Sequence, residues 1–243
     1  MSFLRVPFRL LRVLWCLFQG YWTIRVHFPG LDDRQRSDEV QRWSRQMLRA
    51  LGITLQIEGE APQHGPLLLV ANHLSWLDIL VVHAARHCRF VSKSEVHHWP
   101  LIGPMAEGGR TLFIERASRR DAMRVVHQMA TSLSSGDILA IFPEGTTGDG
   151  SVLLPFHANL IQAAISSQAP VMPLGLSYRE ANGQPSRAVL YIGDDTLVGS
   201  VLRTLGATRL TARVRFGQPQ EAQGRDRRAW TQDLHEAVRH LCV

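Results

Sequence analysis

One histidine and one aspartate are spaced so that they can act together as a general base and its orienting group. His73 and Asp78 belong to the segment NHLSWLD, residues 72–78, which directly follows the apolar run 67–71. A short continuous apolar run of this kind is typical of a buried strand. If His73 lies in the loop after that strand and Asp78 in the first turn of a helix, the carboxylate can hold one imidazole nitrogen. The other nitrogen is then free to accept a proton.

The same segment has two other interpretations. Ser75 followed by Asp78 is a capping-box pattern, in which Asp78 serves only the start of the helix. A histidine and an aspartate can also belong to a metal site, but no third or fourth ligand stands at a recognisable spacing, so no metal is predicted. Taken alone, the segment does not decide between catalysis and capping.

A second polar segment, FPEGTTGDG at residues 142–150, directly follows the predicted strand 138–142. Its glycines allow the backbone to approach a ligand closely, and Glu144, Thr146 and Thr147 supply groups that form hydrogen bonds. A glycine-rich turn between a strand and a helix is also a common structural feature without a functional role. The segment alone therefore leaves both interpretations open.

Two arginines flank a third apolar strand core. Arg110 precedes and Arg116 follows the residues Leu112, Phe113 and Ile114. Guanidinium groups bind phosphate in a bidentate manner, although a solvated arginine at a strand end is the more usual case.

The elements that must position these residues alternate between strands and helices. Apolar runs and period-two patterns predict strands at 53–57, 67–71, 90–92, 111–115, 138–142, 171–178, 188–192 and 212–216. Apolar residues at helical spacing predict helices at 38–51, 119–133, 155–166 and 227–241. This alternation predicts an α/β fold with a mixed, largely parallel sheet flanked by helices. Its functional loops should lie at the strand ends.

The N-terminus has the pattern of a membrane-docking helix. Arg5, Arg9 and Arg12 precede an apolar run at 13–24, whose 12 residues fall short of the roughly 20 that a bilayer span needs. We expect a helix lying in the membrane interface, with its arginines at lipid phosphates and these aromatic residues at the acyl boundary: Trp15, Phe18, Tyr21 and Trp22. A buried N-terminal helix is the alternative. Residues 1–52 are expected to form the membrane-associating segment, and residues 53–243 the α/β domain.

The net charge and the cysteine content limit the classes of binding partner and of metal or disulfide site that are expected. The 27 Lys and Arg residues exceed the 21 Asp and Glu residues, giving +6, which favours nucleic acid, phospholipid headgroups, coenzyme A or an acidic carrier protein. Nucleic-acid binding usually shows basic residues interleaved with stacking aromatics, whereas the aromatics here concentrate at the N-terminus. A membrane surface is therefore favoured over nucleic acid. The three scattered cysteines indicate neither a disulfide framework nor a zinc site.

Four motifs occur in an order that resembles a known family. NH followed by four residues and D, a strand ending FIER, then FPEGT, and then APVMPL at 169–174 are similar in order and spacing to the glycerolipid (lysophospholipid) acyltransferase family. The resemblance covers residues 67–177 and is closest to enzymes of the 1-acylglycerol-3-phosphate acyltransferase type.

This resemblance implies roles for individual residues. His73 would be the general base, and Asp78 the carboxylate that orients it. The remaining residues that match the family's substrate-binding motifs are Glu144, Gly145, Thr146, Arg116 and Lys93. Thr147 stands where the common pattern EGTRS has its arginine, and Arg110 replaces a glycine often found before the strand-end arginine. The resemblance therefore specifies the molecule that receives the acyl group less well than it specifies the catalytic pair.

The implied reaction moves a fatty acyl group from acyl-CoA or acyl carrier protein to the hydroxyl of a lysolipid, with no cofactor. Without a GxSxG motif, direct transfer is expected rather than an acyl-enzyme. The first acceptor hypothesis is 1-acylglycerol 3-phosphate, which gives phosphatidic acid. Arg110 and Arg116 would then hold its phosphate together, in place of the arginine that EGTRS has at the position of Thr147. A lyso-ornithine lipid is the alternative, because some family members acting on such lipids carry a hydroxyl residue after EGT. The expected location is the cytoplasmic face of the inner (plasma) membrane. A lipid or thioester hydrolase and a non-catalytic membrane-binding protein are the rival functions.

Overall fold

A single mixed sheet organises the part of the chain that the computed structural model describes, residues 5–114 and 119–242. Its seven strands lie in the order β1-β7-β6-β2-β5-β3-β4. All neighbouring strands are parallel except β6 and β7, which are antiparallel. The predicted mixed, largely parallel sheet is therefore confirmed. The strand bounds are β1 Ile53–Glu58, β2 Leu67–Ala71, β3 Arg89–Lys93, β4 Leu112–Ile114, β5 Ile138–Ile141, β6 Val171–Arg179 and β7 Leu210–Phe216.

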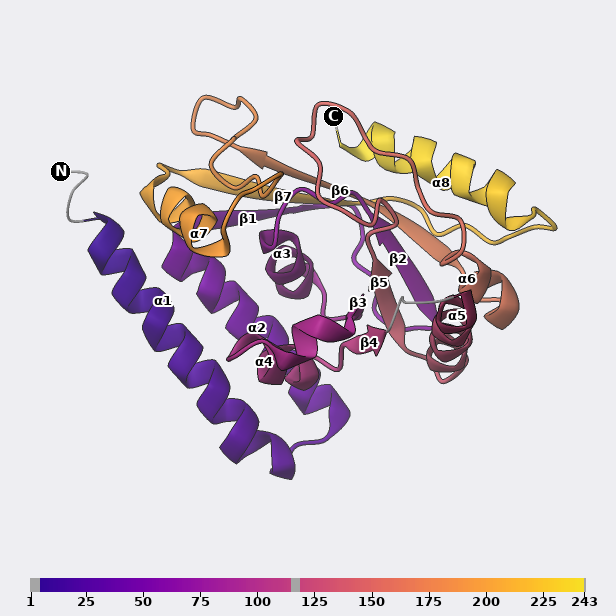
Figure 1. Cartoon of the computed structure of the whole chain (residues 1–243), viewed down its shortest axis with the longest axis horizontal. Helices are drawn as coiled ribbons and strands as arrows, with labels where there is room; N and C mark the ends of the chain where they lie inside the picture. The colour runs from indigo at the N-terminus through magenta and orange to yellow at the C-terminus, as the bar shows by residue number, and fades with distance from the viewer. Residues whose placement is uncertain (1–4, 115–118, 243) are drawn as a thin grey trace.

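Helices cover both faces of this sheet (Figure 1). Their bounds are α1 Arg5–Trp22, α2 Asp33–Leu51, α3 Leu77–Ala85, α4 Ile102–Gly108, α5 Arg119–Ser134, α6 Gln162–Ser167, α7 Leu197–Gly206 and α8 Arg227–Leu241, with shorter helical turns η1 Thr23–His27, η2 Phe28–Gly30 and η3 Ser94–His98. One core contains residues of α1, α2, α3 and α7, and the other contains residues of α5, α6 and α8. Strand β2 contributes to both, with Leu67 and Leu69 in the first core and Leu68 and Val70 in the second. A strand buried on both faces explains the continuous apolar run in the sequence.

Two of the predicted secondary-structure elements are wrong. Residues 188–192 form a turn and irregular backbone rather than a strand. Their backbone groups bond elsewhere, since the Tyr191 N–H donates to the Leu74 carbonyl and the Leu190 carbonyl accepts from Arg203 in α7. The expected helix at 155–166 is reduced to Gln162–Ser167. The backbone ahead of it bonds elsewhere, since the Leu154 N–H donates to Glu144 and the His157 N–H donates to the Pro143 carbonyl.

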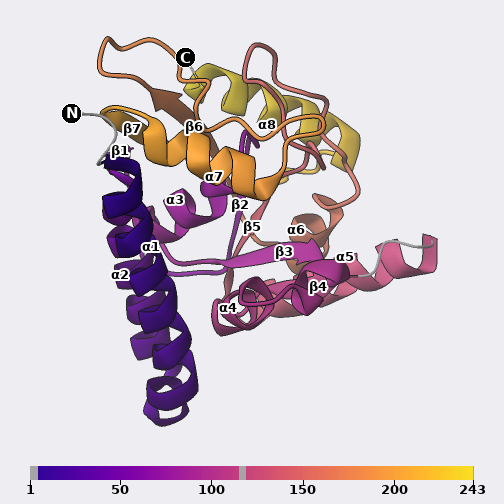
Figure 2. The ribbon, with the colours of Figure 1, turned by 60° about the vertical axis from the view of Figure 1, so that its left-hand side comes forward.

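The N-terminal helix α1 lies beside α2 at one end of the sheet (Figures 1 and 2). Gly20 allows the close approach, because a Cβ at this position would lie 2.5 Å from Nε1 of Trp43. The opposite face of α1 exposes a stripe of large apolar side chains: Phe8, Leu11, Leu14, Trp15, Phe18 and Trp22. Within the described residues, no helix combines the length and the apolar character needed to cross a membrane.

The arginines of α1 do not all face outward as expected. Arg9 donates to the carbonyls of Leu205 and Ala207 at 2.8 and 2.7 Å. The last carbonyls of a helix lack partners within it, so the end of α7 offers acceptors for this side chain. The predicted phosphate contact is therefore wrong for Arg9. The predicted division near residue 52 stays a prediction, and α2 places Leu48 and Leu51 in the same core as β1 and β7.

Candidate active site

The predicted pair of His73 and Asp78 meets directly after β2. The Nδ1 atom of His73 lies 2.8 Å from Oδ2 of Asp78, a side chain with no exposed surface. The same oxygen accepts hydrogen bonds from the N–H groups of Leu74 at 2.6 Å and Ser75 at 2.9 Å. One carboxylate thus both caps the turn that leads into α3 and holds the imidazole. The two interpretations of the sequence are not exclusive.

Tyr178 holds the other oxygen of this carboxylate. Its hydroxyl, carried by β6, donates to Oδ1 of Asp78 at 2.6 Å. Burial, followed by the charge of Asp78, raises the pKa of Tyr178 well above its ordinary value of 10. The phenol therefore remains a hydrogen-bond donor and fixes the carboxylate. Sequence reasoning missed this residue, although a tyrosine within an apolar strand usually needs a partner for its hydroxyl.

The imidazole ring is also fixed by stacking. Phe142 lies parallel to His73, with ring centroids 4.0 Å apart and an interplanar angle of 6°. The His73 side chain remains 19% exposed, and its Nε2 atom makes no hydrogen bond within residues 5–114 and 119–242. The ring thus has one nitrogen bound to Asp78 and one available to a substrate.

Glu144 joins the glycine-rich loop to the loop of His73. Its two carboxyl oxygens accept from the N–H groups of His73 at 2.6 Å and Leu154 at 2.9 Å. In the other direction, the Gly148 N–H donates to the His73 carbonyl at 2.8 Å. Burial raises the pKa of Glu144, against the opposing effect of its two backbone hydrogen bonds. Glu144 therefore positions His73 in this structure, and its contact with an acceptor stays a prediction.

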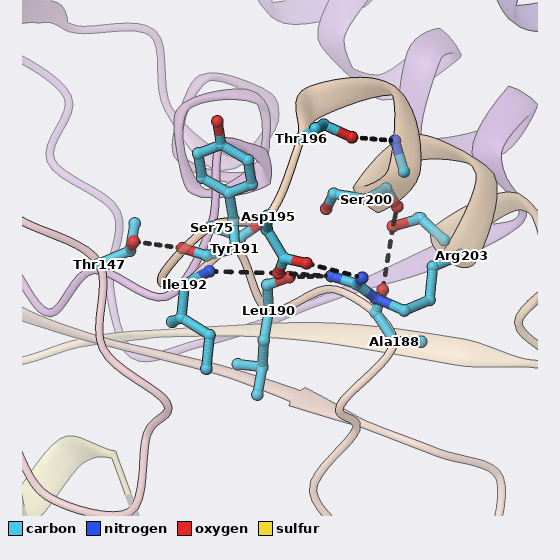
Figure 3. Close-up of polar contacts among 12 residues, drawn as sticks. Ser75, Thr147, Ala188, Leu190, Tyr191, Ile192, Asp195, Thr196, Ser200 and Arg203 are labelled. Atoms are coloured by element: carbon cyan, nitrogen blue, oxygen red, sulfur yellow. Dashed lines mark hydrogen bonds and ion pairs between the residues drawn. The ribbon is translucent and has the colours of Figure 1, made fainter.

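The residues after Glu144 differ in their surroundings. Gly145 has a φ of 72°, and a Cβ there would lie 3.1 Å from the ring of His157, so glycine suits this position. Thr146 is exposed. The hydroxyl of Thr147 instead donates to the backbone carbonyl of Tyr191 (Figure 3). The predicted substrate-binding loop is thus brought beside His73, with Thr147 turned toward the protein.

Of the predicted cationic residues, the two that the structure describes, Lys93 and Arg110, do not lie beside His73. Lys93 is exposed at the carboxyl end of β3. His73 also follows the carboxyl end of its strand, β2, but β3 lies two strands away from β2. Arg116 lies outside the described residues. Arg110 precedes β4, at the amino ends of the parallel strands, and its guanidinium lies 2.8 Å from the carboxylate of Asp33. The idea that Arg110 helps to hold an acceptor phosphate beside His73 is therefore wrong.

Asn72 ties the end of β2 to β6. Its side-chain oxygen accepts from the Leu176 N–H at 2.7 Å, and its amide group donates to the Leu176 carbonyl at 3.0 Å. This pair of bonds extends the contact between the strands beyond the last backbone pair, Ala71 with Leu174. It places the loop of His73 beside the strand that carries Tyr178.

Within residues 5–114 and 119–242, the histidine belongs to no cluster of metal ligands and has no activated thiol beside it. Among the residues that the structure describes, no group of three or more His, Cys, Asp and Glu side chains could hold a metal ion. Burial raises the pKa of Cys242 to about 11 and that of Cys88 far above its ordinary value of 9. Such thiols stay protonated and are poor nucleophiles. The arrangement instead suits proton abstraction by Nε2 of His73.

Comparison with known proteins identifies related sequences over nearly the whole chain. The sequence model of the family described as "Acyltransferase" matches residues 52–177. Lyso-ornithine lipid O-acyltransferase from Pseudomonas aeruginosa is 36% identical, over 98% of this chain and 94% of that protein. The 1-acyl-sn-glycerol-3-phosphate acyltransferase from Neisseria meningitidis is 34% identical, over 95% of this chain and 91% of that protein.

A solved structure has the same fold. The crystal structure of the 1-acyl-sn-glycerophosphate (LPA) acyltransferase PlsC from Thermotoga maritima matches with a TM-score of 0.70. The match covers 99% of this chain and 95% of that one, at 20% sequence identity. At this identity the likeness concerns the fold.

Proposed function

The chain belongs to the acyltransferase family, and we propose that it moves a fatty acyl group from a thioester to the hydroxyl of a lysolipid, with His73 as the general base. The observation that carries this proposal is the fixed imidazole. Nδ1 of His73 is bound to a buried carboxylate, and Nε2 remains free on the exposed side. This arrangement is suited to accepting a proton from an alcohol.

The reaction proceeds without an acyl-enzyme. Nε2 of His73 takes the hydroxyl proton as the lysolipid oxygen attacks the thioester carbonyl carbon. The carbon–sulfur bond then breaks, and the imidazolium returns the proton to the departing thiolate. Asp78 keeps Nδ1 protonated and stabilises the imidazolium, since its charge lies 2.8 Å away. The acyl donor is acyl-CoA or acyl carrier protein, and no cofactor is needed.

The acceptor we favour is a lysolipid without a terminal phosphate, of the lyso-ornithine lipid class. Thr147 places a neutral hydroxyl where the EGTRS pattern has a cation, and Arg110 lies at the amino ends of the parallel strands. These two observations weaken the earlier expectation of 1-acylglycerol 3-phosphate. The P. aeruginosa relative bears the name of a lyso-ornithine lipid enzyme.

The phosphate-bearing acceptor remains the second candidate. The N. meningitidis relative is named for 1-acyl-sn-glycerol 3-phosphate and is nearly as similar over nearly the same length. Lys93 is exposed at the carboxyl end of β3 and offers a cation to a phosphate.

We also propose that α1 docks the enzyme on the cytoplasmic face of the inner (plasma) membrane. Trp15 and Phe18, which belong to the apolar stripe of α1, are 59% and 56% exposed. Helices with one aromatic and apolar face lie in the boundary between headgroups and acyl chains. Docking there would bring the enzyme to its lipid acceptor.

The test is a competition between the two lysolipids. The purified full chain is incubated with an isotope-labelled acyl-CoA or acyl carrier protein and equal concentrations of both lysolipids in vesicles, and labelled lipids are identified by mass spectrometry. Labelled ornithine lipid should predominate. Labelled phosphatidic acid as the main product would establish the second candidate. Release of free fatty acid with no labelled lipid would identify a hydrolase, and no consumption of thioester would favour a non-catalytic membrane protein.

A further inference from the structure

Thr147 occupies the arginine position of the EGTRS pattern, but its side chain is bonded within the protein. Its hydroxyl donates to the carbonyl of Tyr191, 44 positions further along the chain. Tyr191 belongs to residues 188–196, called here the 188–196 segment, which was wrongly expected to contain a strand. The segment thus lies against the glycine-rich loop.

The same segment is bonded to the loop of His73. The Tyr191 N–H donates to the Leu74 carbonyl at 3.2 Å, and the neighbouring His73 carbonyl accepts from the Gly148 N–H at 2.8 Å. Together with the Thr147 bond, these contacts close a ring through three separate parts of the chain. Both backbone polar groups of Tyr191 are therefore held by the two loops that form the candidate active site.

Helix α7 fixes the rest of the segment (Figure 3). Arg203 donates to the Leu190 carbonyl at 2.5 Å and makes two contacts with Asp195, at 2.9 and 3.1 Å. The hydroxyl of Thr204 donates to the Ala188 carbonyl at 3.3 Å. Residues before and after Tyr191 are thus anchored to one helix. The segment has a defined conformation beside the catalytic histidine, although it contains neither helix nor strand.

The side chain of Tyr191 is left available by these bonds. Figure 3 shows its ring standing clear of the hydrogen bonds that hold its backbone. The ring is partly exposed, and its hydroxyl has no hydrogen-bond partner in the part of the chain that the structure describes. A phenol can both donate and accept, so it suits a neutral or zwitterionic headgroup as well as an anionic one.

We propose that the 188–196 segment forms the headgroup side of the acceptor site, with the Tyr191 hydroxyl contacting the lysolipid headgroup and Thr147 as the residue that positions it. This inference rests on the proposed lysolipid acyltransfer. It gives the departure from EGTRS a structural meaning: a hydroxyl at position 147 binds the segment directly beside His73.

The experiment compares substitutions that keep or remove each hydroxyl. Thr147→Val preserves the shape of the side chain without its hydroxyl, Thr147→Ser retains the hydroxyl, and Tyr191→Phe removes only the phenolic oxygen. Thr131→Val, on the exposed surface of α5, is the matched control. For each full-length variant, KM is measured separately for the acyl thioester and for the preferred lysolipid in vesicles.

We expect Thr147→Val and Tyr191→Phe each to raise the lysolipid KM by about fivefold, the effect of losing one neutral hydrogen bond. The thioester KM should not change. Thr147→Ser should restore the wild-type value, and Thr131→Val should leave both constants unchanged. This selectivity for one substrate is not expected of a general loss of stability.

The proposal is overturned if Tyr191→Phe leaves the lysolipid KM unchanged, or if Thr147→Val raises both KM values equally. Tyr191→Phe keeps the backbone bonds intact, so it decides the issue even if Thr147→Val does not fold. A wild-type protein that acylates neither lysolipid would refute the proposed function itself. An active wild type with insensitive variants would refute only the role of the segment.

Discussion

Replacing Asp78 with asparagine separates its charge from its hydrogen bonds. The Oδ2 position faces three N–H groups: the imidazole Nδ1–H of His73 and the backbone N–H groups of Leu74 and Ser75. An amide nitrogen cannot occupy it without placing donors against donors, so the asparagine oxygen should take that place. The amide nitrogen then faces the hydroxyl of Tyr178, which can rotate to accept. The variant should therefore keep the fold and the tautomer of His73.

The magnitude follows from what is lost. With the tautomer retained, Asp78→Asn removes only the negative charge that stabilises the imidazolium. Loss of the support of a general base corresponds to about 10²-fold in kcat, or about 2.7 kcal/mol of activation free energy. An inverted amide would also give the wrong tautomer and a loss of about 10⁴-fold.

The assay measures thiol release from the acyl thioester at saturating lysolipid, with protein stability followed by urea denaturation. Asp78→Ala is the contrasting variant, since it leaves the buried Tyr178 hydroxyl and two backbone N–H groups without an acceptor. It should be strongly destabilised, whereas Asp78→Asn should not. An Asp78→Asn protein with reduced stability but undiminished turnover would show that the carboxylate serves only as a cap.

Three further predictions concern stability, pH and the membrane. Tyr178→Phe should lower the free energy of unfolding by about 1.5–3 kcal/mol, the contribution of a hydrogen bond to a charged group, which urea denaturation can measure. Burial lowers the pKa of His87 to about 4, so its stabilising contribution is present above pH 6.5 and is lost as pH falls toward 4. Between pH 6.5 and 4, the free energy of unfolding of His87→Gln should therefore fall by up to about 3 kcal/mol less than that of the wild type. An equal fall in both proteins would contradict this. Replacing Trp15 and Phe18 together with serine should weaken binding to anionic vesicles by about 10²-fold in sedimentation, whereas unchanged binding would exclude α1 as the docking face.

The sheet was predictable because its central strands are buried on both faces. Burial of β2 on both sides requires an unbroken apolar run, and such a run is visible without the structure. The pairing of His73 with Asp78 was predictable for a similar reason, since both lie in one short turn after that strand. Local spacing limits the possible arrangements of such a turn.

Contacts between distant segments could not be predicted in this way. Residues 188–192 have the apolar character of a strand, and Val189 is fully buried, but the sequence does not reveal that their backbone groups bond to α7 and to the loop of His73. The bonds from Tyr178 to Asp78 and from Thr147 to Tyr191 join residues 100 and 44 positions apart. Each depends on the order of strands in the sheet, which periodicity does not encode.

The central claim is direct transfer from thioester to lysolipid with His73 as the base. It is tested most directly in a single turnover, in which the protein is mixed with an equimolar amount of labelled acyl thioester. The reaction is run with and without the preferred lysolipid. Release of thiol, label in the lipid product and label on the protein are followed over time. We predict thiol release only when the lysolipid is present, in step with the labelled lipid product, and a large loss of that rate in His73→Gln. A burst of thiol without lysolipid, accompanied by labelled protein, would contradict the account.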